Sequence, residues 1–289
     1  MNNSSFQSRL GLGTAQFGLD YGINNTEGKM SLEEVQKILQ YAAINGISTI
    51  DTARNYGDSE IRIGTSLSKS NLTRNFEIIT KLSFSEELTL RENIDLSKVR
   101  LNCEKVDVFL FHSYRDYKLY LDKEDFDRIS RSETFGVSIY TNDEIRKILN
   151  DSRIKIIQVP FNLLDNHSIR GEILLEAKEK GKIVHTRSCF LQGLFFTNRQ
   201  KIPASLKHLR KSLQKIDEIC IEFDLTIVQL AIGYCFSKNY IDRVIIGVDS
   251  LTHLQDNLSA INKGIPSSVF DKIDDIKVAH PRLLNPANW

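Results

Sequence analysis

The sequence predicts a single-domain α/β protein with the (β/α)8 TIM barrel fold. Two features carry this prediction: eight short apolar runs, and amphipathic stretches that separate them. The 289 residues allow about 36 residues per repeat, which is the size of a βα unit in such a barrel. No linker or low-complexity block divides the chain, so we expect 1–289 to form one domain. A doubly wound open sheet is the alternative architecture.

Eight runs of apolar residues are expected to form the strands. Each run is rich in β-branched or aromatic residues, as is typical of buried parallel strands. In chain order they are 9–14, 47–51, 76–81, 106–112, 135–140, 154–159, 182–187 and 242–248.

The stretches between the runs have helical periodicity. In 31–47, 141–151 and 169–182, apolar residues recur at three- and four-residue spacing, as in helices that bury one face. Ser31 followed by Glu34 predicts a capping box at the start of the first of these helices.

Helix ends and irregular segments can also be located. Gly46 and Gly181 stand where two helices should end. The connection 188–205 is longer than a typical βα loop of ~2–6 residues, so it is a candidate cofactor clasp. Segment 206–238 has two helical stretches where one crossover would suffice. The tail 280–289 contains two prolines and is expected to be irregular and packed over its neighbours, with a loose, solvated tail as the alternative.

Composition excludes several classes of protein. With 38 basic and 37 acidic residues the net charge is +1, so we expect neither a nucleic-acid partner nor a membrane surface. The N-terminus lacks the pattern of a signal peptide, and the apolar segment 226–236 is shorter than the ~20 residues of a membrane span. Four cysteines without CxxC or zinc spacing indicate free thiols in a cytoplasmic protein.

Four side chains with acid–base chemistry lie at or just after strand ends. Asp51 ends the second run, Tyr56 follows five positions later, Lys81 ends the third run, and His112 ends the fourth. Because the carboxyl ends of parallel strands meet at one rim, we expect these side chains to lie close together. They predict a proton-transfer site at a carbonyl group.

The chemistry of this set favours a function over four separate structural roles. A phenol titrates near pH ~10 and is a poor acid at neutrality. A nearby ammonium stabilises the phenolate, a carboxylate fixes the lysine, and an imidazole can hydrogen-bond the reacting oxygen. Singly, Asp51 could cap a helix, Lys81 could form a rim salt bridge, and His112 could be a core histidine. Together they suit protonation of a carbonyl oxygen while a hydride reaches its carbon.

These residues lie in motifs through which the chain resembles the aldo-keto reductases. The most specific motif is IDTARNYGDSE at 50–60, which matches the family's Asp-Thr-Ala, Tyr-Gly and Glu signature. ITKL at 79–82 and DVFLFH at 107–112 match its lysine and histidine motifs. Further family-like segments are 10–18, 158–162, 191–195 and 245–258.

The resemblance implies a role for each rim residue. Tyr56 would be the general acid or base, Lys81 and Asp51 would tune it, and His112 would orient the substrate. The implied activity is the NAD(P)H-dependent reduction of an aldehyde or ketone, such as an aldose or keto-sugar, to an alcohol, or the reverse reaction. Residues expected to line the substrate pocket are Gln16, Phe17, Tyr21 and Tyr114.

The cofactor would bind in the family's extended form, since the chain has no GxGxxG motif. Ser138 and Gln158 would hold the nicotinamide carboxamide, but Ile139 replaces the usual Asn. Arg187 occupies a position that is usually aromatic; its guanidinium could stack on a ring and favour the reduced nicotinamide, or it could form a structural salt bridge. The full expected set is Gly13, Thr14, Ser138, Gln158, Arg187, Ser188, Leu194, Gly247, Asp249, His253, Asp256 and Asn257.

The segment after the last predicted strand bears on the choice between NADP(H) and NAD(H). NADP-dependent relatives usually place Lys or Arg there, whereas 247–262 contains neither and carries Asp249 and Asp256. An acidic group near the ribose accepts from the 2′-hydroxyl of NAD and repels a phosphate. Family habit nevertheless leads us to expect NADP(H), with NAD(H) as the alternative. Cations that could serve a phosphate from the clasp are Arg199, Lys201 and Arg210.

Three other functions are weighed against a reductase. A Schiff-base aldolase would use Lys81 as nucleophile, but an ion pair with Asp51 would keep the lysine protonated. A catalytically idle regulatory subunit would bind the dinucleotide, although the four rim residues are intact. A metal hydrolase would use Asp51, His112 and His185, but His185 lies inside its strand. We expect no metal, and a small carbonyl or sugar as the only partner; the sequence indicates no oligomeric state.

Overall fold

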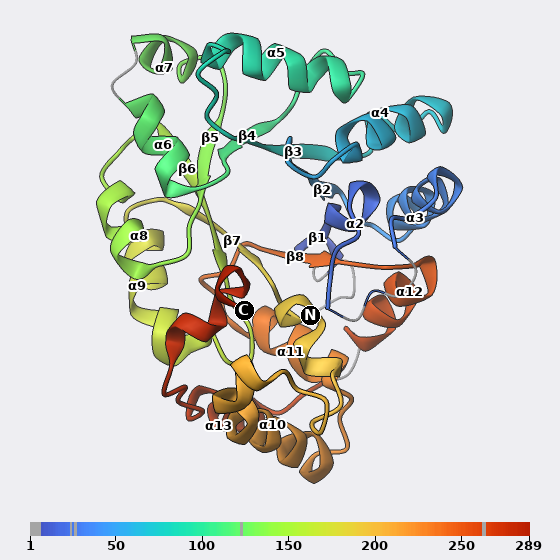
Figure 1. The fold of residues 1–289 in the computed structure, drawn as a ribbon, viewed down its shortest axis with the longest axis vertical. Helices are drawn as coiled ribbons and strands as arrows, with labels where there is room; N and C mark the ends of the chain where they lie inside the picture. Colours follow the sequence, from blue (N-terminus) through green and yellow to red (C-terminus); the bar gives the residue numbers. More distant parts are fainter. Residues whose placement is uncertain (1–6, 24, 26–27, 122–123, 262–263) are drawn as a thin grey trace.

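The computed structural model describes residues 7–23, 25, 28–121, 124–261 and 264–289. It is a closed barrel of eight parallel strands with helices outside it (Figure 1). Each strand pairs with its neighbours in sequence, and β1 pairs with β8. This confirms the predicted (β/α)8 TIM barrel, because first and last strands do not pair in an open sheet. The strands are β1 (Leu10–Gly13), β2 (Thr49–Asp51), β3 (Glu77–Leu82), β4 (Val108–Phe111), β5 (Phe135–Ser138), β6 (Ile154–Pro160), β7 (Ile183–Arg187) and β8 (Arg243–Gly247).

Helices connect successive strands around the outside of the barrel (Figure 1). Two α-helices, α10 and α11, lie between β7 and β8, as the sequence of 206–238 predicts. The α-helices are α2 (Ala15–Gly18), α3 (Leu32–Ile44), α4 (Ser59–Lys69), α5 (Leu90–Arg100), α6 (Tyr114–Leu121), α7 (Glu124–Ile129), α8 (Asn142–Ile148), α9 (His167–Glu179), α10 (Arg210–Glu222), α11 (Ile227–Ser237), α12 (Leu251–Ala260) and α13 (Ser267–Asp274). Short 3-10 turns are η1 (Leu191–Phe196), η2 (Ala204–Leu209), η3 (Pro281–Leu284) and η4 (Pro286–Asn288).

The start of α3 differs from the expected capping box. The Ser31 hydroxyl accepts from the Glu34 backbone N–H at 3.1 Å, which is the expected half of the box. The Glu34 carboxylate instead accepts from the backbone N–H of Leu251 at 2.8 Å. It thereby links the N-termini of α3 and α12. Gly46 and Gly181 have φ of +79° and +73°, which confirms them as helix-terminating positions.

The barrel interior is apolar in one layer and polar in the next. Side chains alternate across a strand, and a buried cluster of Ile79, Val108, Leu110 and Ile156 is separate from the main core between sheet and helices. The next residue on the same inward face of β3 after Ile79 is Lys81, and on β6 the next after Ile156 is Gln158. The polar layer therefore rests on a packed apolar floor.

The tail after α13 packs against the body of the protein, as predicted. Leu283 and Leu284 are buried, and the indole N–H of Trp289 donates to the Leu283 carbonyl at 2.8 Å. Among the described residues no single helix has the length and apolar character of a membrane span. Only when taken together do the segments Ala204–Glu222 and Ile227–Ser237 have that length and apolar character, and a bend of 97° separates them.

Candidate active site

Asp51 and Lys81 form a buried ion pair at the ends of β2 and β3, with side chains only 5% and 1% exposed. The Lys81 ammonium also donates to the Thr52 carbonyl at 3.1 Å. Burial alone would lower the pKa of Lys81, but the Asp51 carboxylate and Tyr56 outweigh it and raise that pKa. Lys81 is therefore a fixed ammonium near neutral pH.

Tyr56 lies beside this pair on the loop between β2 and α4. The Lys81 Nζ atom is 5.1 Å from the centroid of its ring. The His112 ring meets the Tyr56 ring edge-on, with centroids 5.7 Å apart and an interplanar angle of 87°. The four residues expected at one rim are thus brought together.

The Tyr56 loop is held by a direct contact between two stretches of backbone. A Cβ added to Gly18, at the end of α2, would lie 1.9 Å from the Tyr56 carbonyl oxygen and 2.5 Å from the Ser59 nitrogen. Gly57 has φ of +58°, and its Cβ would lie 2.3 Å from the Gly18 carbonyl oxygen. Only glycine permits such a close approach of two backbone segments. The contact with α2 therefore fixes the backbone of the loop that carries the Tyr56 phenol.

A second support for the loop is a buried network that sequence analysis missed. Glu60 is fully buried, and its carboxylate lies 3.3 Å from Arg54 Nε and 2.9 Å from Arg100 Nε. The Thr80 hydroxyl donates to it at 2.8 Å, and Arg100 also donates to the Gly57 carbonyl at 2.5 Å. Glu60 stands in the signature motif, but its partner from α5 has no sequence signal.

His112 is a neutral imidazole at the end of β4. Burial, followed by the charges of Lys81 and Arg187, lowers its pKa to about 3. Its Nδ1 atom is buried and has no hydrogen-bond partner among the described residues. The ring can therefore exchange hydrogen bonds with a ligand but does not carry a charge near neutral pH.

Gln158 connects β6, which is expected to bind the cofactor, to the Asp51–Lys81 ion pair. Its Nε2 donates to Asp51 Oδ2 at 2.7 Å, while its Oε1 is buried without a partner among the described residues. Ser138 is its neighbour in the β5–β6 register. An amide acceptor and a hydroxyl at adjacent positions fit a carboxamide group. Ile139, which replaces the family's Asn, is buried in the core.

Arg187 at the end of β7 stacks on an aromatic ring of the protein itself. Its guanidinium carbon is 4.3 Å from the centroid of Tyr140. Nε donates to Ser138 Oγ and Nη1 to Ser188 Oγ, both at 3.3 Å. It forms no ion pair with any described carboxylate, so the structural salt bridge is not observed. Arg187 places a positive charge beside the predicted nicotinamide position.

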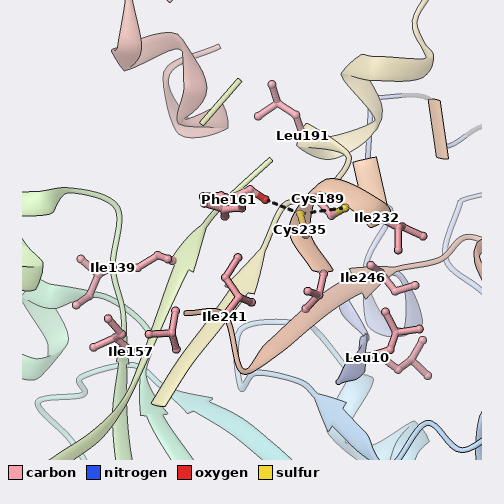
Figure 2. Close-up of a cluster of buried hydrophobic side chains, with 14 of the residues drawn as sticks. Leu10, Ile139, Ile157, Phe161, Cys189, Leu191, Ile232, Cys235, Ile241 and Ile246 are labelled. Atoms are coloured by element: carbon pink, nitrogen blue, oxygen red, sulfur yellow. Dashed lines mark hydrogen bonds between the residues drawn. The ribbon is translucent and has the colours of Figure 1, made fainter. Parts of the chain in front are cut away.

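The clasp after β7 starts from a buried cluster, which Figure 2 shows. The Cys235 thiol of α11 lies 3.6 Å from the Phe161 carbonyl oxygen and 3.8 Å from the Cys189 sulfur. Leu191 and Leu194 of the clasp are fully buried. This packing anchors the clasp to α11 and to the loop after β6. All four cysteines are free, as expected: Cys103, Cys189, Cys220 and Cys235.

From this anchor the clasp crosses to the loop after β1. Gln192 Nε2 donates to the Tyr21 hydroxyl at 2.7 Å, and the Ile23 N–H donates to the Gln192 carbonyl at 3.2 Å. Burial, and then the proximity of Tyr56, raises the pKa of Tyr21 to about 12. Tyr21 is thus close to Tyr56, and the clasp and the first loop meet over the barrel.

Arg199 closes the far end of the clasp. Its guanidinium donates twice to Asp217 of α10, at 2.8 and 2.7 Å, and to the Thr197 carbonyl at 2.8 Å. These bonds occupy one of the three cations that were expected to be candidates for binding a cofactor phosphate. Lys201 and Arg210 are exposed.

Other predicted residues have mainly supporting positions. The Thr14 hydroxyl, after Gly13, donates to the Asp51 carbonyl at 3.0 Å. Gln16 lies against Gly247, where an added Cβ would come within 2.9 Å of its amide. Phe17 is completely buried in the core, so its side chain contributes packing rather than pocket surface.

Tyr114, at the start of α6, is half-buried. Its ring lies 6.0 Å from Lys118 Nζ and 5.7 Å from Lys147 Nζ. These distances place two cations over an aromatic ring that was expected to line the substrate pocket.

The N-terminus of α12, expected near the adenosine ribose, is acidic. Asp249 Oδ1 is buried without a described partner, and its other oxygen lies 3.7 Å from His253 Nδ1. The Glu34 carboxylate occupies the Leu251 N–H. His253 and Asp256 are exposed and Asn257 is buried. Glu34 could not be found from sequence, because α3 and α12 meet only in the folded chain.

The metal-hydrolase alternative has no structural support in the described residues. His185 lies within β7 and is 2% exposed. Burial, and then the charge of Arg243, lowers its pKa to about 3. No group of three potential metal ligands occurs in the described part of the chain.

Comparison with known proteins agrees with this geometry. The model of the Aldo/keto reductase family matches residues 9–278, whereas no curated protein matches the chain. An aldo-keto reductase from Bacillus halodurans in its holo form is similar in fold, with a TM-score of 0.74 and 20% identity over 93% of this chain and 92% of that one.

A protein from Pseudomonas aeruginosa, described as an aldo-keto reductase, also shares the fold. Its TM-score is 0.63 and its identity 20%, over 87% of this chain and 88% of that one. At this identity both likenesses concern the fold alone, while the family match covers nearly all of the sequence. The chain belongs to the aldo/keto reductase family and is an oxidoreductase of that family.

Proposed function

We propose that this chain reduces the carbonyl group of a small hydroxylated molecule, such as an aldose or keto-sugar, with Tyr56 as the general acid. Membership of the family implies NAD(P)H-dependent carbonyl reduction. The observation that carries the assignment of Tyr56 is the buried Asp51–Lys81 pair, whose ammonium lies 5.1 Å from the phenol ring.

The residues around Tyr56 would divide the work of proton transfer. The dinucleotide, when bound between Ser138, Gln158 and the clasp, supplies a hydride to the carbonyl carbon. Tyr56 gives its proton to the carbonyl oxygen, and the Lys81 ammonium stabilises the phenolate that remains. Neutral His112 forms a hydrogen bond with the same oxygen and orients it.

The charge on Lys81 argues against the aldolase alternative. A Schiff base requires an unprotonated amine, whereas Asp51 and Tyr56 raise the pKa of Lys81 despite its burial. Borohydride treatment in the presence of an aldehyde should therefore leave Lys81 unmodified. A trapped adduct on Lys81 would revive the aldolase.

Replacing Tyr56 tests the proposed acid. We expect Tyr56→Phe to lower kcat by about 100- to 10,000-fold, the usual contribution of general acid catalysis, with little change in cofactor affinity. The assay follows cofactor absorbance against a panel of aldehydes and keto-sugars, and calorimetry measures cofactor binding. Tyr41→Phe on α3 is the matched control. If Tyr56→Phe turns over at the wild-type rate, Tyr56 is not the acid.

We further propose that NAD(H) is the preferred cofactor, although family habit predicts NADP(H). The carboxylates of Glu34 and Asp249 lie at the N-terminus of α12, where a 2′-phosphate would meet negative charge. The free Asp249 oxygen suits a ribose hydroxyl. Arg199 is engaged by Asp217, which removes one candidate cation.

Cofactor preference can be measured directly. We expect kcat/KM for NADH to exceed that for NADPH, and Glu34→Gln to shift the ratio toward NADPH several-fold, because the amide can keep the bond to Leu251 but loses the charge. Glu33→Gln is the control, since Glu33 is an exposed neighbour that pairs with Lys37 instead. A wild-type preference for NADPH would contradict this proposal without affecting the role of Tyr56.

A further inference from the structure

A basic cavity opens at the protein surface between the end of the clasp region and the C-terminal tail, and its four basic residues are exposed. Its volume is about 280 Å³. One wall comes from η2 and the other from the tail around η3; Figure 1 shows the red tail close to the gold segment that leads into α10. The lining residues are Ala204, Ser205, Lys207, His208, His280, Arg282 and Leu283.

The cavity gathers basic side chains without acidic partners. Lys207, His208, His280 and Arg282 line it, and none of its lining residues is acidic. Within the described part of the chain, these four side chains form no ion pair and no side-chain hydrogen bond. By contrast, Arg199 in the clasp is paired with Asp217. With a net charge of only +1, such a cluster does not follow from overall composition.

The two imidazoles are in contact across the cavity wall. The ring centroids of His208 and His280 are 4.5 Å apart. A pair of imidazoles can hold a divalent metal, but Lys207 and Arg282 would repel a dication in the same small space. An anion is favoured instead, because the charges of Lys207 and Arg282 would both attract it.

We propose that this cavity, whose lining includes none of the four residues of the candidate active site, is a binding site for a phosphoryl group. Arg282 offers a planar fork of donors, Lys207 a point charge, and Ser205 a hydroxyl, a combination that suits phosphate oxygens. The volume of about 280 Å³ lies just below the ~300–1,000 Å³ of pockets for larger ligands. The site therefore takes inorganic phosphate or the phosphate end of a small metabolite.

Occupancy of this site would join two segments that are far apart in sequence. Arg282 also lines a larger cavity of about 520 Å³ that includes Tyr140, the ring on which Arg187 stacks. A phosphoryl group bound by Lys207 and Arg282 would tie the tail to η2 and restrict the wall of that larger cavity. The bound anion should stabilise the folded chain, by an amount that increases with the logarithm of its concentration relative to Kd.

Calorimetry and thermal unfolding of the full chain test the site. Inorganic phosphate is titrated at pH 7 and constant ionic strength, with sodium chloride making up the difference. We expect saturable binding to one site by calorimetry, and a Tm that keeps rising with the logarithm of the phosphate concentration above Kd. The double variant Lys207→Gln/Arg282→Gln should weaken binding at least tenfold. The matched control is Lys211→Gln/Lys215→Gln, which removes the same charge from exposed positions on α10 and should bind as wild type.

A second arm identifies the source of the phosphoryl group. A hexose phosphate that binds more tightly than inorganic phosphate, while the free hexose does not compete, supports a phosphorylated metabolite; equal affinity supports inorganic phosphate. Binding that does not saturate, or that is equally weakened in the α10 control, overturns the site. Neither measurement depends on turnover, so the result stands apart from the proposed reductase activity.

Discussion

At the scale of single residues, burial decides which side chains of the barrel interior carry charge. Lys81 remains charged because its carboxylate partner is buried with it, whereas His112 and His185 lack such a partner and stay neutral. The same low-polarity environment therefore has opposite outcomes for an ion pair and for a lone imidazole. An ammonium beside the phenol and a neutral imidazole opposite it are both consequences of this difference.

The buried imidazoles make stability depend on pH. The pKa of His185 falls from 6.5 to about 3 in the folded chain, so between these values the unfolded chain binds more protons. The contribution of His185 to the free energy of unfolding is fully present above pH 6.5. As the pH falls from 6.5 toward 3, it is lost by about 1.4 kcal/mol per pH unit for one proton. Chemical denaturation at pH 7, 6 and 5 should show that the free energy of unfolding falls less with decreasing pH in His185→Gln than in the wild type. Exposed His253→Gln is the control. An unchanged pH slope in His185→Gln would contradict this account.

The sequence identified functional residues most reliably where they lie at strand ends. Asp51, Tyr56, Lys81 and His112 could be recognised because each stands at or after a strand end in a family motif. The bond from Gln158 to Asp51 could not, because the two residues are 107 positions apart and meet only across the closed barrel. Glu34 at α12 was missed for the same reason.

At the scale of elements, short irregular segments place the active site. β2 and β3 supply Asp51 and Lys81, and His112 directly follows β4. Tyr56 instead lies on a loop that α2 and the Glu60 network hold in place. The clasp is anchored by a buried thiol cluster at one end and by Arg199 and Asp217 at the other. These elements have little periodicity, so their conformation is not visible in the sequence.

The contact between α2 and the Tyr56 loop predicts a selective defect. Gly18→Ala would place a Cβ 1.9 Å from the Tyr56 carbonyl oxygen, so the loop must move while the barrel stays intact. We expect kcat to fall at least tenfold, and the free energy of unfolding to fall by about 1–3 kcal/mol, the usual cost of overpacking. Gly264→Ala is the control, since its Cβ would meet nothing within 4 Å. Wild-type kcat in Gly18→Ala would exclude a positioning role for α2.

At the scale of the whole molecule, the barrel depends on joining its first and last strands. β1 and β8 pair along four residues, and Arg9 reinforces this seam just before β1. Its guanidinium donates to the carbonyls of Phe236, Lys238 and Ile241 at 3.1, 3.2 and 2.6 Å. One N-terminal side chain thus satisfies three carbonyl groups that lie more than 200 positions later.

Arg9 should therefore contribute to the stability of the whole barrel. We expect Arg9→Ala to lower the free energy of unfolding by about 3 kcal/mol, because three partly buried carbonyl groups lose a charged donor. Urea denaturation measures the change, and Arg74→Ala, at an exposed position, is the control. A loss no larger than that of the control would mean that strand pairing alone closes the barrel.

The sequence by itself determined the eightfold alternation of strands and helices, the family, and the four residues of the predicted proton-transfer site. These depend on local periodicity and on short motifs, which neighbouring residues along the chain specify. Only the tertiary structure decided that Arg187 stacks on Tyr140, that Glu34 and Asp249 make the start of α12 acidic, and that a basic cavity forms between η2 and the tail. Each of these arises where segments distant in sequence are brought together by barrel closure.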